Sequence, residues 1–263
     1  MLQNLSAWVK AKGYIRDKCQ TGKNKKINVC ILSLYGGKET VSGVDIYAYQ
    51  LISNLSKYCF FNHIVCLRHK HLKYLEVPLR ALLKPISACR DGVDVVHFSS
   101  QLVLSPCILL KSIKERAVVT IHDMVPYPFM KSSFYKKYYS IKSLFYIFPL
   151  ILLARSAKRI IVPFKTIKED LVRLGFEAKK IKVIRMGVDT NRFKPMSYVK
   201  SQITGRRVIL TLIKDAKREG LEQLLQAFLI LLKKGMPVEL HVGSSISYDV
   251  LLKMIKKYRV PRN

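Results

Sequence analysis

The sequence is poor in acidic residues and lacks the patterns that mark secreted, membrane-spanning or metal-binding proteins. Its six cysteines form no CxxC pair and no Cys/His metal spacing, which favours a reducing, cytosolic compartment and no bound metal. The longest apolar run, Leu144 to Ala154, is interrupted by Pro149 and is shorter than the about 20 residues that cross a bilayer. The polar start of the chain does not resemble a secretory signal.

The chain contains 17 Asp and Glu residues and 47 Lys and Arg residues, which gives a formal net charge of +30. Such a charge favours an anionic partner, which could be nucleic acid, an anionic membrane surface or a phosphorylated substrate. The basic residues are spread along the chain and no nucleic-acid-binding module is recognisable, so no nucleic-acid partner is expected. With 263 residues, 49% of them hydrophobic, the chain can form one large core or two modest ones.

Short apolar segments alternate with helical patterns, as in α/β proteins with a parallel sheet. The expected strands are Ile27–Leu34, His63–Leu67, Val93–Phe98, Ala117–Ile121, Lys158–Val162 and Ile181–Ile184. Residues 1–26 precede them as a basic extension, which is either an amphipathic interfacial helix or a frayed tail. Residues 68–90 show no assignable pattern.

A helix is expected between the last two of these strands. Thr166 and Glu169 have the spacing of a capping box, which predicts the helix start at Thr166. Gly175 is placed to end the helix in a left-handed conformation.

Two glycines, Gly36 and Gly37, follow the first strand, and Gly43 opens the next helix. Glycine allows the backbone to approach a ligand, and a helix start offers unpaired N–H groups and a positive dipole end. This loop is therefore predicted to bind an anionic group such as a phosphate.

Two histidines stand at strand ends. His122, followed by Asp123, comes directly after the strand Ala117–Ile121, and His97 lies near the end of Val93–Phe98. The carboxyl ends of parallel strands face the ligand crevice of an open α/β sheet, so both histidines are expected to line it. A histidine there can exchange a proton or bind a hydroxyl, or it can simply be held by backbone groups.

The segment Lys131–Ala154 is rich in Tyr, Phe and Lys. Its aromatic side chains could pack in the core, which is favoured from Phe145 onward. They could also rest on a bilayer with lysines at the headgroups, which suits the part from Tyr135 to Tyr139.

The amino-acid sequences of several of these stretches resemble those of the retaining GT-B glycosyltransferases of family 4. The resemblance is carried by Ala157–Pro195 (AKRIIVPFKTIKEDL … KVIRMGVDTNRFKP), by VVTIHDMVP around His122 and by DVVH ending at His97. It implies a complete N-terminal Rossmann-like domain at 27–196 and an incomplete C-terminal Rossmann-like domain at 197–263. The latter would contain strands at Arg207–Ile213 and Val238–Val242 and helices at Leu221–Leu232 and Val250–Ile255.

The resemblance also implies an activity: transfer of a sugar from a nucleotide-sugar to a hydroxyl of a glycan or lipid-linked acceptor, with retention and without metal or cofactor. His122 would lie beside the transferred sugar as the catalytic histidine. Donor or acceptor contacts are implied for Gly36, Gly37, Gly43, His97, Asp123 and Lys214. Lys214 replaces the arginine that the family places at the donor diphosphate, and Glu219 replaces its lysine, so the charge that would stabilise the leaving group is altered.

The chain ends after two βα units of the second domain, before the position of the family's paired glutamates. This predicts a C-terminally truncated enzyme with compromised activity. The alternative is a non-catalytic half that binds an anionic membrane or a glycan acceptor, with a separate chain supplying the missing part. The expected location is the cytoplasm, including the inner face of the membrane.

Overall fold

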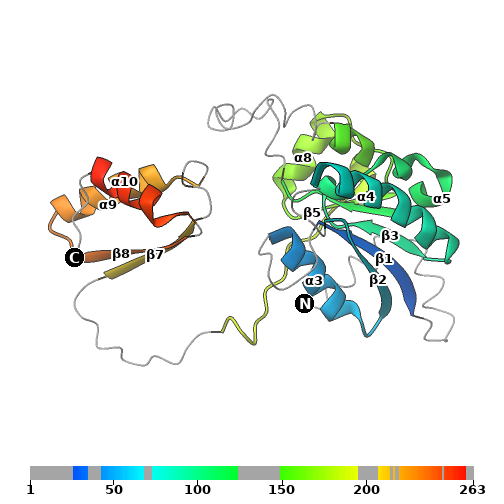
Figure 1. Ribbon diagram of the computed structural model, residues 1–263, viewed down its shortest axis with the longest axis horizontal. Helices are drawn as coiled ribbons and strands as arrows, with labels where there is room; N and C mark the ends of the chain where they lie inside the picture. The colour runs from blue at the N-terminus through cyan, green and yellow to red at the C-terminus, as the bar shows by residue number, and fades with distance from the viewer. Residues whose placement is uncertain are drawn as a thin grey trace. The chain divides into compact units, whose positions relative to one another are not determined.

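The computed structural model describes residues 26–34, 43–67, 73–123, 149–194, 207–213, 216, 219–244 and 246–258. Two compact units make up the chain, Met1–Val188 and Asp189–Asn263. Figure 1 shows a larger sheet with helices in the first and a small sheet with α9 and α10 in the second. The extension before residue 26, the Gly36–Gly37 loop, most of Lys131–Ala154 and Lys214 lie outside the described residues.

The first unit is built on a six-stranded sheet of order β2-β1-β3-β4-β5-β6, in which all neighbours run parallel. Its strands are β1 (Ile27–Ser33), β2 (Cys59–Val65), β3 (Val95–Phe98), β4 (Ala117–Thr120), β5 (Arg159–Val162) and β6 (Ile181–Val183). All six expected strands are therefore confirmed, although β2 begins four residues before His63, at Cys59. The strand order reverses between β1 and β3, where open α/β sheets bind their ligands.

Helices cover both faces of this sheet. They are α3 (Gly43–Leu55), α4 (Lys73–Arg90), the short α5 (Lys111–Lys114) and α8 (Lys165–Arg173), with 3₁₀ turns η2 (Gln101–Val103), η3 (Pro106–Leu109) and η4 (Ala178–Lys180). Residues 149–154 are also helical. One face packs on α4, η3, α5 and α8 in the main hydrophobic core, and the other packs on Leu51 and Leu55 of α3 in a smaller one.

Helix α4 occupies the stretch in which the sequence shows no assignable pattern. Pro78 and Pro85 lie inside it, and proline normally breaks a helix because it lacks an N–H and clashes with the preceding turn. Val77, Ala81 and Ala88 are nevertheless buried against the sheet. Tertiary packing here overrides the local signal.

Helix α8 was expected from the sequence, but its start differs. The N-cap is Phe164, without a side-chain cap bond, so the capping box at Thr166 is wrong: Thr166 already lies in the first turn. The predicted end at Gly175 is confirmed, because Gly175 has φ +84°. Its N–H donates to the Val172 carbonyl at 2.9 Å and that of Phe176 to the Leu171 carbonyl at 3.0 Å, which together form a Schellman motif.

The second unit has the expected βαβα order. It contains the parallel strands β7 (Arg207–Ile213) and β8 (Val238–Ser244) and the helices α9 (Leu221–Lys233) and α10 (Tyr248–Lys257). Ile213, Leu221 and Leu225 are the buried centre of its small core. On the other face of β7, Val208, Leu210 and Leu212 are 56%, 70% and 80% exposed.

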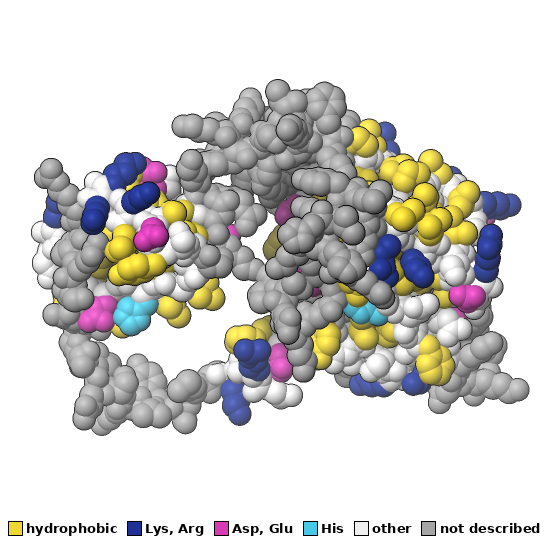
Figure 2. Space-filling view, in the orientation of Figure 1, with side chains coloured by type: hydrophobic (Ala, Val, Ile, Leu, Met, Phe, Trp, Pro, Cys, Tyr) yellow, Lys and Arg dark blue, Asp and Glu magenta, His cyan; other side chains and the backbone are white. Residues whose placement is uncertain are grey.

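Charge is dispersed over the surface. On the face shown in Figure 2, Lys and Arg side chains appear on both units, separated by apolar and polar ones. Of the helices that the structure describes, none combines the length and the apolar character that crossing a bilayer requires.

Candidate functional site

Polar side chains gather where β1, β3 and β4 end, beside the reversal in strand order. Ser99 and Gln101 follow β3, His122 and Asp123 follow β4, and α3 contributes Tyr47. The fold brings them together because the carboxyl ends of parallel strands share one edge of the sheet.

His122 lies at the centre of this group and is partly buried. Its Nε2 is 2.7 Å from the carbonyl oxygen of Ser99. A carbonyl oxygen only accepts hydrogen bonds, so Nε2 carries the proton and Nδ1 of the neutral ring is an acceptor. Burial lowers the pKa of His122, while the bond to Ser99 and the nearby Asp123 act in the opposite direction. The ring is thus suited to accept a hydroxyl proton near neutral pH.

Tyr47 supports His122 from the side of α3. Its ring packs edge-on against His122, with centroids 5.0 Å apart, and against His97, with centroids 6.2 Å apart. The Tyr47 hydroxyl lies 3.2 Å from Oγ1 of Thr120. Burial raises the pKa of Tyr47 to about 12, although the bond to Thr120 lowers it, so the phenol stays protonated.

His97 is fully buried within β3, and its Nε2 lies 2.9 Å from Oγ1 of Thr120. It does not line a crevice as expected, because β3 is buried along its whole length. A direct contact with donor or acceptor stays a prediction. In the structure His97 helps to position Tyr47: both lie within hydrogen-bond distance of Oγ1 of Thr120, and their rings pack edge-on.

Gln101 holds the residue that follows His122. Its Nε2 lies 3.3 Å from Oδ1 and 3.4 Å from the backbone oxygen of Asp123. Gln101 is only 5% exposed, whereas Asp123 is exposed. Oε1 of Gln101 and Oγ of Ser99 are buried with no hydrogen-bond partner among the described residues. The Asp123 carboxylate is therefore presented at the surface beside His122 in a fixed position.

Sequence reasoning missed Ser99, Gln101 and the polar role of Tyr47. The run Ser99-Ser100-Gln101 directly after a buried strand carried the same edge signal as His122 and could have been found. Tyr47 sits on the apolar face of its helix, so nothing local distinguishes its hydroxyl from core packing.

A second polar pair joins the ends of β1 and β2. Oγ of Ser33 lies 2.7 Å from Nε2 of His63. Burial lowers the pKa of His63, and the buried carboxylate of Asp45, in the first turn of α3, raises it. No local pattern predicts this pair, because residues 30 positions apart meet only through strand pairing.

The remaining predicted ligand contacts are Gly36, Gly37, Gly43 and Lys214. Gly43 begins α3, and a Cβ added there would meet no atom within 4 Å, so close packing does not require glycine. Gly36, Gly37 and Lys214 lie outside the described residues. Among the residues that the structure describes, no three His, Cys, Asp or Glu side chains form a group that could hold a metal ion.

Comparison with known proteins bears on the family and the fold. The sequence profile of Glycosyltransferase Family 4 matches residues 41–192, more than half of the chain. Among curated protein sequences, none matches the chain.

The solved structures that resemble it include two glycosyltransferases. Anabaena HepE, in complex with UDP and glucose, is 15% identical with a TM-score of 0.59, over 90% of this chain and 67% of that chain. The lipopolysaccharide outer core galactosyltransferase WaaB is 11% identical with a TM-score of 0.54, over 89% of this chain and 66% of that chain. Both have the GT-B type of α/β fold, and the chain spans about two thirds of their length. At these identities the likeness shows the fold alone.

Proposed function

The chain belongs to glycosyltransferase family 4, and from this premise we propose that it transfers a sugar from a nucleotide-sugar donor to a hydroxyl acceptor, with retention. The site would lie at the carboxyl edge of the first unit's sheet. The observation that carries the proposal is the position of His122. It follows β4, Nε2 is held by the Ser99 carbonyl, and Nδ1 is left as an acceptor.

In this proposal Nδ1 of His122 accepts a hydrogen bond from a hydroxyl of the sugar or of the acceptor. For retention, the acceptor oxygen attacks the anomeric carbon on the face from which the diphosphate departs. The bond from that carbon to the diphosphate breaks, and the acceptor hydroxyl loses its proton. A neutral imidazole can position this hydroxyl and take up the proton. Asp123, held by Gln101, can accept a second hydroxyl bond beside it.

The donor diphosphate would be bound without metal. The Gly36–Gly37 loop and the start of α3 at Gly43 would supply backbone N–H groups, and Lys214 would supply positive charge. The net charge of +30 also favours a phosphorylated donor.

The choice of substrates follows the structural relatives. HepE was solved with UDP and glucose, and WaaB is named a galactosyltransferase. UDP-glucose and UDP-galactose are therefore the first donors to test, against a glycan or lipid-linked acceptor. An acceptor in an anionic membrane would place the reaction at the cytoplasmic face, where the basic surface assists binding.

A second candidate function is an acceptor- or membrane-binding half without its own donor site. The observation that favours it is the open face of β7 in the second unit, where Leu210 and Leu212 are exposed. The exposed Glu219 also stands where the family has a lysine. A separate chain would then supply the donor-binding part.

Calorimetric titration of the full chain with UDP-glucose and UDP-galactose, together with detection of released UDP, separates the two. The acceptors would be a panel of free sugars and a short polyprenyl phosphate. For a transferase, His122→Ala abolishes UDP release, whereas His241→Ala, which removes an exposed histidine of the second unit, leaves it unchanged. A chain that binds neither donor but sediments with anionic vesicles at low salt has the second function.

A further inference from the structure

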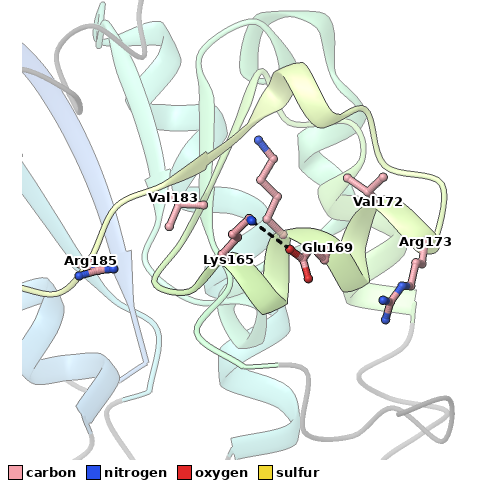
Figure 3. Close-up of a pocket in the computed structure, with 7 residues that line it drawn as sticks. Lys165, Glu169, Val172, Arg173, Val183 and Arg185 are labelled. Atoms are coloured by element: carbon pink, nitrogen blue, oxygen red, sulfur yellow. Dashed lines mark ion pairs between the residues drawn. The ribbon is translucent and has the colours of Figure 1, made fainter. Parts of the chain in front are cut away.

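An open groove of about 650 Å³ runs between α8 and the edge strand β6. It is lined by Lys165, Lys168, Glu169, Val172, Arg173, Val183 and Arg185. In Figure 3 the α8 residues form one wall, while Val183 and Arg185 lie on the strand and exit loop opposite. The groove belongs to the first unit alone, and β5 separates β6 from the strand that precedes His122. The proposed sugar-transfer site does not use these residues.

The groove carries surplus positive charge. Lys165 pairs with Glu169 at 3.7 Å, and Arg173 pairs with Asp170 at 3.2 Å. For Lys168 on α8 and Arg185 after β6, no ion pair is found within the described part of the chain. An occupant with negative charge would therefore meet two cations on opposite walls that are not already neutralised.

Apolar side chains lie between these cations. Val172 is 41% exposed and Val183 is 39% exposed, one on each wall. An inorganic anion would leave both uncovered. A ligand that alternates apolar and acidic groups would cover them and reach the cations as well.

The backbone of β6 is open to pairing. In the described residues β6 pairs only with β5. The N–H of Ile184 donates to the Val162 carbonyl at 2.9 Å, so it points toward β5. Successive peptide groups of a parallel strand alternate in direction, so the N–H and carbonyl of Val183 point to the unpaired edge. Such an edge is a template for an added strand.

Two long segments outside the described residues do not match the groove in charge. Residues 1–25 contain six Lys and Arg against one Asp, and residues 124–148 contain four lysines and no carboxylate. Their charge opposes that of the groove. Neither segment supplies the acidic groups that the groove would attract.

We propose that the groove binds an extended acidic segment of a partner polypeptide, which adds to the sheet as a strand beside β6. Apolar side chains of the segment would contact Val172 and Val183, and its carboxylates would pair with Lys168 and Arg185. Hydrogen bonds from the Val183 backbone would supply much of the affinity. A flat anionic membrane fits a concave groove along one helix less well.

The probe is a fluorescent peptide of alternating Glu and Val, whose binding to the full chain is followed by anisotropy. Lys168→Glu together with Arg185→Glu is expected to weaken binding by about tenfold or more, as is typical when charge pairs are reversed at an interface. The matched control, Lys111→Glu with Lys114→Glu, makes the same change in net charge on the exposed α5 and should retain binding.

Strand addition is tested separately from charge. Val183→Pro removes the outward N–H, and an edge strand tolerates proline when that N–H faces solvent. In a second experiment the backbone of the peptide is N-methylated and the protein is not mutated. A loss of binding in that experiment cannot come from misfolding of the protein. Both changes should reduce binding by about tenfold or more.

Three outcomes overturn the proposal. An equal loss in the α5 control means non-specific attraction to a basic protein. Unchanged binding of the N-methylated peptide means that no strand is added. Sedimentation with anionic vesicles that requires Lys168 and Arg185, without peptide binding, makes the groove a lipid site.

Discussion

The strands β1 and β7 have seven residues each and a similar apolar character, but β1 is mostly buried and β7 is mostly not. Five of the seven residues of β1 are buried, from Val29 to Ser33. In β7 only the last, Ile213, is buried. In the part of the chain that the structure describes, β1 has a neighbour on each side and helices on both faces of its sheet, whereas β7 has one neighbour and helices on one face. Burial therefore depends on the neighbours that a strand acquires, and apolar composition alone does not provide it.

The two units differ in the same way in how completely their sheets are covered. The first unit has a two-sided core on which the strand ends and the group around His122 are held in place. The second unit, in its described residues, has one small core and an open apolar face. The sheet edge that carries His122 is thus held from both faces, whereas the sheet of the second unit is less completely covered in its described residues.

The test with the largest expected effect removes one apolar side chain from each unit, buried in the first and exposed in the second. Phe98 is fully buried in β3, and Phe98→Ala should lower the free energy of unfolding of the first unit by about 3–5 kcal/mol, through lost burial and a cavity. Leu212 is 80% exposed, and Leu212→Ala should change stability by less than about 0.5 kcal/mol. Denaturant unfolding by circular dichroism measures both, and similar losses would refute the contrast.

A smaller effect is expected at the glycines that end α8 and α9. Gly175 and Gly235 have φ values of +84° and +70°, so alanine should cost about 1 kcal/mol at either. At Gly175 the new Cβ would also lie 3.1 Å from Nη2 of Arg155, whereas at Gly235 it would meet no atom within 4 Å. Thermal unfolding should show the larger loss for Gly175→Ala. The reverse order would mean that the second unit is the more tightly packed.

The pH dependence of stability distinguishes the units in a further way. Burial lowers the pKa of both His122 and His63 in the folded first unit. The unfolded chain, with histidine pKa values near about 6.5, then binds more protons than the folded one, so stability should fall as pH decreases from about 6.5 through the folded pKa values. Urea unfolding across this range should show the fall, and His122→Gln should reduce it. A stability that rises on acidification would contradict the buried, neutral state of His122.

The smallest change in stability is expected on the open face of β7. Replacing Leu210 and Leu212 by lysine should leave the free energy of unfolding within about 0.5 kcal/mol, because both side chains are already in solvent. Binding of the dye ANS should fall at the same time, because the apolar patch is removed. Unfolding of the second unit by this pair would show that the face is covered in solution.

Much of this fold could be predicted from sequence, because buried parallel strands are short apolar runs and Gly175 marks its helix end. The start of α8 could not be predicted. The capping-box spacing pointed to Thr166, but the helix begins at Lys165 with Phe164 as an N-cap that makes no side-chain hydrogen bond. Helix α4 could not be predicted because it contains Pro78 and Pro85, which disfavour a helix. Burial of its apolar side chains against the sheet offsets that unfavourable free energy.

At the candidate site, the position of His122 and Asp123 directly after a strand made them candidates, and the resemblance to the family singled out His122. Neither could show that His97 is enclosed in the sheet, that Tyr47 contacts both histidines, or that His63 meets Ser33. These facts depend on which strands become neighbours, and strand order is not written in any local pattern. The glycine loop and Lys214 stay predictions.

The most direct test of the account is the ¹⁵N NMR spectrum of the His122 ring, recorded before and after addition of UDP-glucose or UDP-galactose. The account predicts a neutral ring at neutral pH, protonated at Nε2, whose Nδ1 signal moves on addition of one of these donors while that of His241 does not. A proton on Nδ1 in the unliganded protein, or a His122 ring indifferent to both donors, would contradict a sugar-transfer site at this edge of the sheet.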